Sequence, residues 1–132
     1  LYPKLTKQQI AIDNLFSYTL EDAIIGALSV MFRENDQDLL IPLLDRLISV
    51  LNNYIPDTGF IHGLDTPSKA DLCVLVLLEA TMPFGVANKV AKINSTGERY
   101  PRLQRLVDRV KNYPRIKDYM ESTKCTLKKG PI

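Results

Sequence analysis

The side chains that most often carry out chemistry are few in this sequence and stand far apart. His62 is the only histidine, and no Ser, Cys or acid lies at a spacing that marks a catalytic triad with it. Cys73 lies inside an apolar run and is expected to be a small buried hydrophobe, whereas Cys125 is expected to be a surface thiol. The sequence has no Gly-rich phosphate loop, metal-ligand cluster or paired catalytic carboxylates. We therefore expect no catalytic residue and no metal site within the chain, and we interpret His62 as structural or simply exposed.

Composition places the chain among soluble, globular proteins. Its 132 residues are 45% hydrophobic and 24% charged, as is usual for a single domain spanning residues 1–132. The longest apolar run is 72–78, far short of the ~20 residues of a membrane helix, so no membrane partner is expected. Two cysteines in unlike surroundings do not suggest a disulfide framework, which favours a reducing, cytoplasmic setting.

The charge distribution is uneven although the net charge is only +2. From Arg99 onward the chain carries ten Lys or Arg residues and three Asp or Glu residues. A basic end can meet nucleic acid or an acidic partner. Because no aromatic residues interleave with the charges of the tail as a stacking surface requires, we interpret this region as a solvated helix face and a Lys-rich tail. Nucleic acid is therefore not an expected partner.

The first half of the chain predicts two long helices. Apolar residues at steps of three and four predict a helix from Thr6 to about Arg33, with Thr6 and Gln9 forming a capping box. The same spacing predicts a second helix from about Asp38, its expected N-cap, to about residue 54, with Pro42 confined to the first turn. A short polar turn between two amphipathic helices predicts an antiparallel hairpin.

The apolar run 72–78 has no helical period, so a buried strand and a helix compete. The residues before it favour a helix. Ser68 as N-cap places Asp71 at the third helical position, where the two side chains can satisfy each other's backbone amides, and Pro67 can pack on Leu72 as a hydrophobic staple. We predict a central helix that is surrounded on all sides.

Prolines punctuate the rest of the chain. Pro83 ends the central helix, a short helix is predicted over 86–93, and Pro101 and Pro114 each begin a further helix. The last helix is expected to bury Ile116 and Met120. With no strand pattern, the prediction is an all-α bundle of five to six helices, in which the long antiparallel hairpin packs on the buried central helix.

The stretch 63–72, Gly-Leu-Asp-Thr-Pro-Ser-Lys-Ala-Asp-Leu, resembles the capping box and staple of the glutathione S-transferase C-terminal domain. The stretches 100–103 and 112–120 are similar to the last two helices of that family, with its aromatic-Pro-x-Leu opening and internal Pro-x-Ile step. The spacer before the capping box departs slightly in length. The resemblance covers essentially the whole chain, and it implies the all-helical fold of that domain.

The resemblance also implies partners for the chain. The family's helical domain follows a thioredoxin-like domain that holds glutathione, and no such portion is present here. Because the chain begins at Leu1, we expect a piece of a longer parent. That parent is expected to form a homodimer and to conjugate glutathione, its co-substrate, to a small hydrophobic electrophile. No cofactor is expected to bind this domain alone.

Five residues of the first helix take roles by this resemblance. Glu21, or Asp22 with a one-residue slip, would reach across the dimer to the glutamyl amine of glutathione. Ala27 and Met31 would line the electrophile pocket, with Phe32 the alternative to Met31. The simpler readings are an exposed helix acid for Glu21 and an ordinary core position for Met31.

Two other functions remain open at this stage. Similar helical domains serve assembly in elongation factor one gamma and in aminoacyl-tRNA synthetase complexes, and the basic C-terminal part favours such an interaction module. An inactive, crystallin-like relative is a third alternative. We favour the transferase because of the acid at Glu21 and because the chain ends soon after its last helix.

Overall fold

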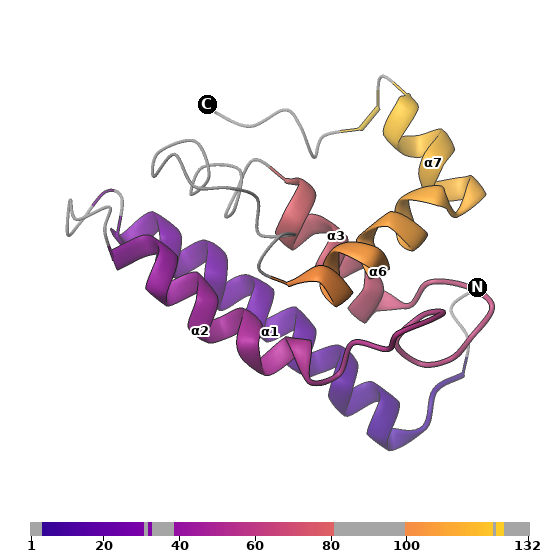
Figure 1. Ribbon diagram of the computed structural model, residues 1–132, viewed down its shortest axis with the longest axis horizontal. Coiled ribbons are helices and arrows are strands. Elements are labelled where there is room, and N and C mark those ends of the chain that lie inside the picture. Colours follow the sequence, from indigo (N-terminus) through magenta and orange to yellow (C-terminus); the bar gives the residue numbers. More distant parts are fainter. Residues whose placement is uncertain (1–3, 31, 33–38, 81–99, 123, 126–132) are drawn as a thin grey trace.

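The computed structural model describes residues 4–30, 32, 39–80, 100–122 and 124–125 (Figure 1). These ranges contain five helices and no strand, which confirms the predicted all-α fold. The helices α1 and α2 lie side by side as a hairpin, and α3 packs on α1 (Figure 1). Helix α6 packs against both α3 and α7. Within the described ranges, no helix has the length and apolarity needed to cross a membrane.

Helix α1 spans Lys7–Ser29 and begins with the predicted capping box. The amide of Gln9 donates to Thr6 Oγ1 at 3.2 Å, and the amide of Thr6 donates to Gln9 Oε1 at 2.9 Å. The helix ends before the predicted Arg33, which lies outside the described residues. Its inner face carries Phe16 and Ala23 into the core.

Helix α2 spans Leu40–Asn52 and packs closely against α1. Pro42 lies in its first turn, as predicted. Its N-cap is Leu39, which makes no side-chain capping bond, while the predicted cap, Asp38, lies outside the described residues. The two helices pack closely at Gly26 of α1, where an added Cβ atom would lie 2.7 Å from Leu43 Cδ2. A side chain at this point would require Leu43 to shift.

Helix α3 spans Lys69–Glu79 and passes through the middle of the bundle. Val74 and Leu77 are fully buried between α1 and α6. The prediction that α3 is surrounded on all sides is wrong, since Leu72 is 42% exposed and Val76 is only half-buried. The apolar run has no helical period because most of its residues meet protein, while Leu72 and Val76 remain partly open to solvent. Pro83 and the short helix predicted over 86–93 lie outside the described residues.

The last two helices are α6, Pro101–Asn112, and α7, Pro114–Glu121, each with proline in its first turn as predicted. Helix α6 buries its apolar stripe completely, but α7 buries no residue. Ile116 and Met120 only rest against the core and stay half-buried. Cys125 was expected at the surface, but it is 7% exposed, and its amide donates to the carbonyl oxygen of Ser122 at 3.4 Å.

Arg109 of α6 holds the first part of the loop between α2 and α3. Two glycines, Gly59 and Gly63, take positive φ angles of 72° and 68° and allow the loop to turn. The Arg109 guanidinium then donates to the carbonyl oxygens of Gly59 at 2.9 Å and of Asp57 and Pro56 at 3.3 Å each. Three carbonyls held by one planar group define the path of the loop toward the head of α3.

We expect Arg109→Lys to lower the free energy of unfolding by about 1 kcal/mol, because an ammonium cannot reproduce the planar fork and the site is partly solvated. Arg105→Lys, on the exposed side of the same helix, should change it by less than about 0.5 kcal/mol. Urea denaturation of both variants measures the difference. Equal midpoints would show that the arginine fork does not hold the loop.

Candidate functional site

The N-terminus of α3 is buried, and the carboxylate of one residue, Asp71, accepts hydrogen bonds from the polar groups there. Asp71 is completely buried, and its Oδ2 atom accepts bonds from the Ser68 amide at 2.7 Å and the Ser68 hydroxyl at 2.8 Å. Its Oδ1 atom accepts the amide of Ile61 at 3.0 Å. The structure thus forms the predicted capping box and adds a contact to the preceding loop. The staple of Pro67 on Leu72 stays a prediction, and Leu72 is partly open to solvent.

A second buried carboxylate, Asp13 of α1, reaches the same helix head. Its Oδ1 atom accepts the amide of Ala70 at 3.1 Å and lies 2.8 Å from His62 Nε2. Both side chains are nearly inaccessible, with exposures of 6% for Asp13 and 1% for His62. One carboxylate therefore joins α1, the loop and the first turn of α3. This result selects the structural interpretation of His62.

Sequence reasoning missed Asp13, although a signal was present. Asp13 precedes Phe16 by three residues, so it lies on the core side of α1. An acid on a buried helix face requires a partner, because burying an unpaired carboxylate is costly. The lone histidine was the available partner, but 49 residues separate the two in the chain.

The buried cluster is built for structure and not for catalysis. A histidine paired with a carboxylate can act as a general base, but the His62 side chain has no accessible surface from which to reach a substrate. Burial raises the pKa of the neighbouring Cys73 thiol and outweighs the opposing charge of Lys69, while Asp13 and Ser17 have smaller effects that raise and lower it. The thiol therefore stays protonated at neutral pH and is a poor nucleophile.

The outward face of α1 is apolar along much of its length. Three large side chains of α1 lie at helical spacing on this face, and Phe32 follows just beyond the end of the helix; all four remain exposed to solvent: Tyr18, Ile25, Leu28 and Phe32, at 64%, 59%, 42% and 74%. We call them the outer stripe. Glu21 is exposed and shares the face, since it lies three residues after Tyr18 and four before Ile25. Glu21 therefore lies between two apolar side chains of the outer stripe, Tyr18 and Ile25.

The other residues predicted to contact ligands have different surroundings. Asp22 is exposed and lies four residues before Gly26, on the side of α1 that faces α2. Ala27 is fully buried in the core. Met31 lies outside the described residues, and Phe32 is the most exposed member of the outer stripe. The structure therefore places Glu21 on the outward face of α1, leaves Phe32 exposed beyond the end of the helix, and directs Asp22 and Ala27 elsewhere.

A second apolar surface lies between α3 and α7. Six residues, with Arg115 at the edge, line a groove with a volume of about 350 Å³: Leu72, Leu75, Val76, Ile116, Tyr119 and Met120. The groove exists because the open side of α3 faces the half-buried side chains of α7. We call it the α3–α7 groove.

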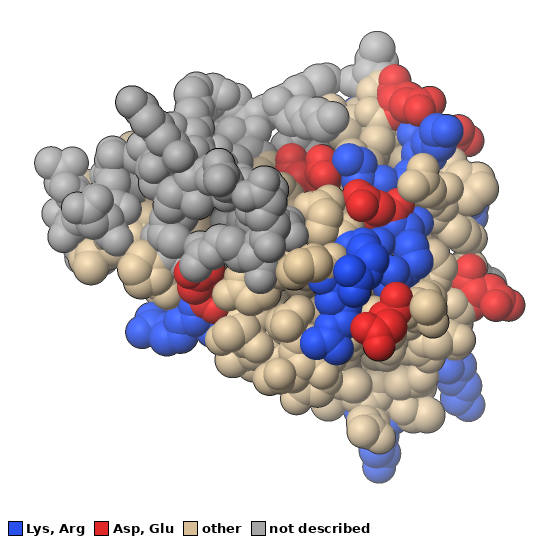
Figure 2. Space-filling model, viewed as in Figure 1, with Lys and Arg blue, Asp and Glu red and all other residues tan. Residues whose placement is uncertain are grey.

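The charged surface is mixed rather than uniformly basic. On the face shown in Figure 2, Lys and Arg side chains gather near the centre, and Asp and Glu side chains lie among them. Arg109, one of the basic residues of α6, is already bonded to the loop carbonyls. Among the described residues, no three His, Cys, Asp or Glu side chains form a group that could hold a metal ion.

Comparison with known families gives one match. The family model described as the glutathione S-transferase C-terminal domain matches residues 28–123, well over half of the chain. The match includes α2, α3, α6 and α7 and begins near the end of α1, so Glu21 and Asp22 lie outside it. No curated protein sequence gives a significant match.

The buried capping box should matter more to stability than the exposed one at α1, because water cannot replace its bonds. We expect Asp71→Ala to cost about 2–4 kcal/mol, since it leaves two buried amides without an acceptor, and Ser68→Ala to cost about 1 kcal/mol. Thr6→Ala, in the exposed capping box, should cost only about 0.5 kcal/mol. Denaturation midpoints test this order, and equal losses at Thr6 and Asp71 would contradict it.

The Asp13–His62 pair should also be structural. His62→Ala and Asp13→Ala should each lower the free energy of unfolding by about 2–3 kcal/mol, because the first removes a bond to a buried carboxylate and the second removes the acceptor of the Ala70 amide and the partner of His62. Asp22→Ala, at an exposed position of the same helix, should change it by less than about 0.5 kcal/mol. The double variant should show a coupling of at least about 0.5 kcal/mol. Additive losses would mean that the two side chains do not act as a pair.

Proposed function

Since the chain belongs to the glutathione S-transferase C-terminal domain family, we propose that it is the helical half of an enzyme that conjugates glutathione to small hydrophobic electrophiles. The observation that carries this proposal is the outer stripe with Glu21 at its centre. A row of exposed apolar side chains around one carboxylate suits a cleft that takes an apolar substrate and a cationic amine.

We infer that a partner covers the outer stripe. Exposed apolar surface of this extent is unusual on a free-standing domain and generally marks a binding face. In the proposed parent, the N-terminal thioredoxin-like domain and a second protomer cover this face and close the cleft. The α3–α7 groove is a second apolar surface, and we assign it to docking of the thioredoxin-like domain, whose apolar side chains would fill it.

Glu21 supplies the charge that the cleft needs. The glutamyl end of glutathione carries an ammonium group, and a carboxylate can accept a charge-assisted hydrogen bond from it. In the proposed dimer, Glu21 reaches the glutathione held by the partner protomer. Asp22 is the weaker candidate, since it lies on the side of α1 that faces α2.

The electrophile would meet the C-terminal end of α1. Phe32 offers a large aromatic surface there, and Met31 follows the same helix end in the sequence. Ala27 would contact the electrophile only if the core face of α1 opened, because the side chain is fully buried. A parent with this activity would work in the cytoplasm, where glutathione is abundant.

The second candidate is an interaction module of a translation factor or an aminoacyl-tRNA synthetase complex. The basic bias of the chain after Arg99 supports it. The mixed charges of the face in Figure 2 weaken that support, because no single-sign surface is offered to an acidic partner there.

The test uses the full-length parent. Replacing Glu21 by Gln removes one charged hydrogen bond, worth about 1.5–3 kcal/mol, and should weaken glutathione binding by about one to two orders of magnitude. Asp22→Asn is the matched control and should leave the affinity within about twofold. Calorimetric titration with glutathione gives both values. Unchanged affinity in both variants would remove the cross-dimer assignment, and no binding by the parent would favour the interaction module.

The 132-residue chain itself should neither bind glutathione nor conjugate it to a chlorodinitrobenzene. Most of the glutathione site belongs to the thioredoxin-like domain of the proposed parent, and one carboxylate cannot replace it. Retention of the bare chain on immobilised glutathione, with elution by free glutathione, would contradict this expectation.

A further inference from the structure

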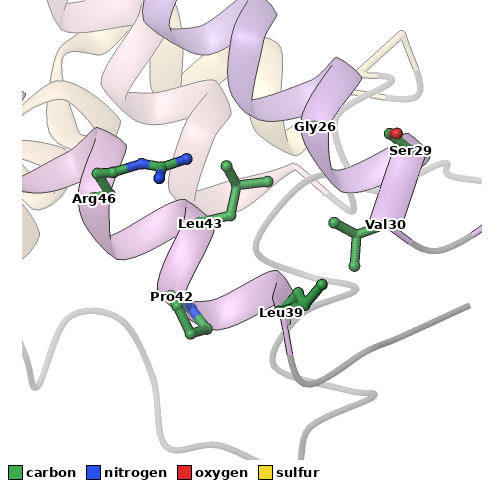
Figure 3. A pocket seen from close by; sticks show the side chains of 7 residues that line it. All are labelled: Gly26, Ser29, Val30, Leu39, Pro42, Leu43 and Arg46. Atoms are coloured by element: carbon green, nitrogen blue, oxygen red, sulfur yellow. The ribbon is translucent and has the colours of Figure 1, made fainter. Parts of the chain in front are cut away.

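A second hollow lies between α1 and α2, near the end at which the hairpin turns. Figure 3 shows its lining, with Gly26 and Ser29 on α1, Val30 at its C-cap, Leu43 and Arg46 on α2, and Leu39 at the N-cap of α2. Its volume is about 380 Å³, within the range of pockets that hold small molecules. We call it the hairpin groove.

The floor of the hairpin groove follows from the close packing of the two helices. Gly26 has no side chain to fill the space above Leu43, and an added Cβ atom would lie 2.7 Å from Leu43 Cδ2. Val30 is nearly buried at the α1 side, whereas Leu39 is 45% exposed at the mouth. The walls are therefore branched aliphatic side chains, which suit an alkyl chain or a ring better than a small hydrated ion.

The polar groups of the hairpin groove are a cation and a hydroxyl. Arg46 lies one turn after Pro42, and its guanidinium extends across the α2 side of the groove (Figure 3). Ser29 presents its hydroxyl on the opposite helix (Figure 3). Within the described part of the chain, Arg46 forms no ion pair. A guanidinium beside an apolar wall selects a ligand that combines a carboxylate with an apolar body.

We propose that the hairpin groove binds small amphipathic carboxylates. The alkyl or aryl body lies on Val30, Leu39 and Leu43, and the carboxylate accepts hydrogen bonds from the Arg46 guanidinium. This site goes beyond the proposed function, because its α1 residues face α2, whereas Glu21 and the outer stripe face away from the core. A neutral molecule of the same shape gains only the apolar part of the contact.

The test compares two probes of equal length, octanoate and 1-octanol, by titration into the 132-residue chain. Octanoate should bind saturably and more tightly than 1-octanol. Arg46→Gln should weaken octanoate about three- to fivefold, as expected for a solvent-exposed charge pair, and should leave 1-octanol unchanged. Arg105→Gln, at an exposed arginine outside the groove, is the matched control and should alter neither affinity.

Methyl NMR locates the bound probe independently of affinity. Octanoate should shift the methyl resonances of Val30, Leu39 and Leu43, while those of Leu72 and Val76 in the α3–α7 groove stay in place. The proposal is overturned if the two probes bind with equal affinity or if Arg46→Gln leaves the affinity for octanoate unchanged. It is also overturned if the methyl shifts are confined to the α3–α7 groove. It is also overturned if octanoate fails to bind, for instance because the chain self-associates through this face, which sedimentation would reveal.

Discussion

Ser68, Ala70 and Asp71 at the N-terminus of α3 are buried, so the amide groups there must find acceptors within the protein. Any helix leaves its first amides without intrahelical partners, and water normally supplies what a cap does not. Here two buried carboxylates supply the acceptors. Asp71 binds the amides of Ser68 and Ile61, and Asp13 binds the amide of Ala70. Asp71 belongs to α3, whereas Asp13 belongs to α1. The need of the buried amides of α3 for acceptors therefore also determines how α1 lies against α3.

That constraint determines which face of α1 is available to partners. With Asp13 held at the head of α3 and Gly26 held against α2, the rotation of α1 about its axis is fixed at two points almost four turns apart. The remaining face is the one that carries Glu21 and the exposed side chains from Tyr18 to Phe32. A buried structural acid near the start of the helix thereby orients an exposed acid farther along it, and the proposed function depends on this orientation.

The fold could be predicted from sequence because its helices begin at local signals, the capping boxes at Thr6 and Ser68 and the prolines 101 and 114, which act within one turn. What could not be predicted depends on contacts between distant segments. The pairing of Asp13 with His62 and the burial of Cys125 arise only when the chain folds back on itself. For the candidate site, helical spacing alone left Glu21 and Asp22 as alternatives. The packing of Gly26 against α2 places Asp22 on the side of α1 that faces α2, whereas Glu21 lies on the outward face. Their roles toward glutathione remain predictions.

The weakest part of the bundle adjoins one of its open apolar surfaces. Helix α7 has eight residues and buries none of them completely, and so short a helix has little stability of its own. Its half-buried side chains, Ile116 and Met120, form one wall of the α3–α7 groove. A partner that fills the groove would bury these side chains and the open side of α3 together, and binding to the folded form stabilises that form by mass action. Docking of a neighbouring domain would then be coupled to the burial of these α7 side chains and of the open side of α3. In a two-domain parent, the helical half would therefore be less stable alone than beside the domain that covers it.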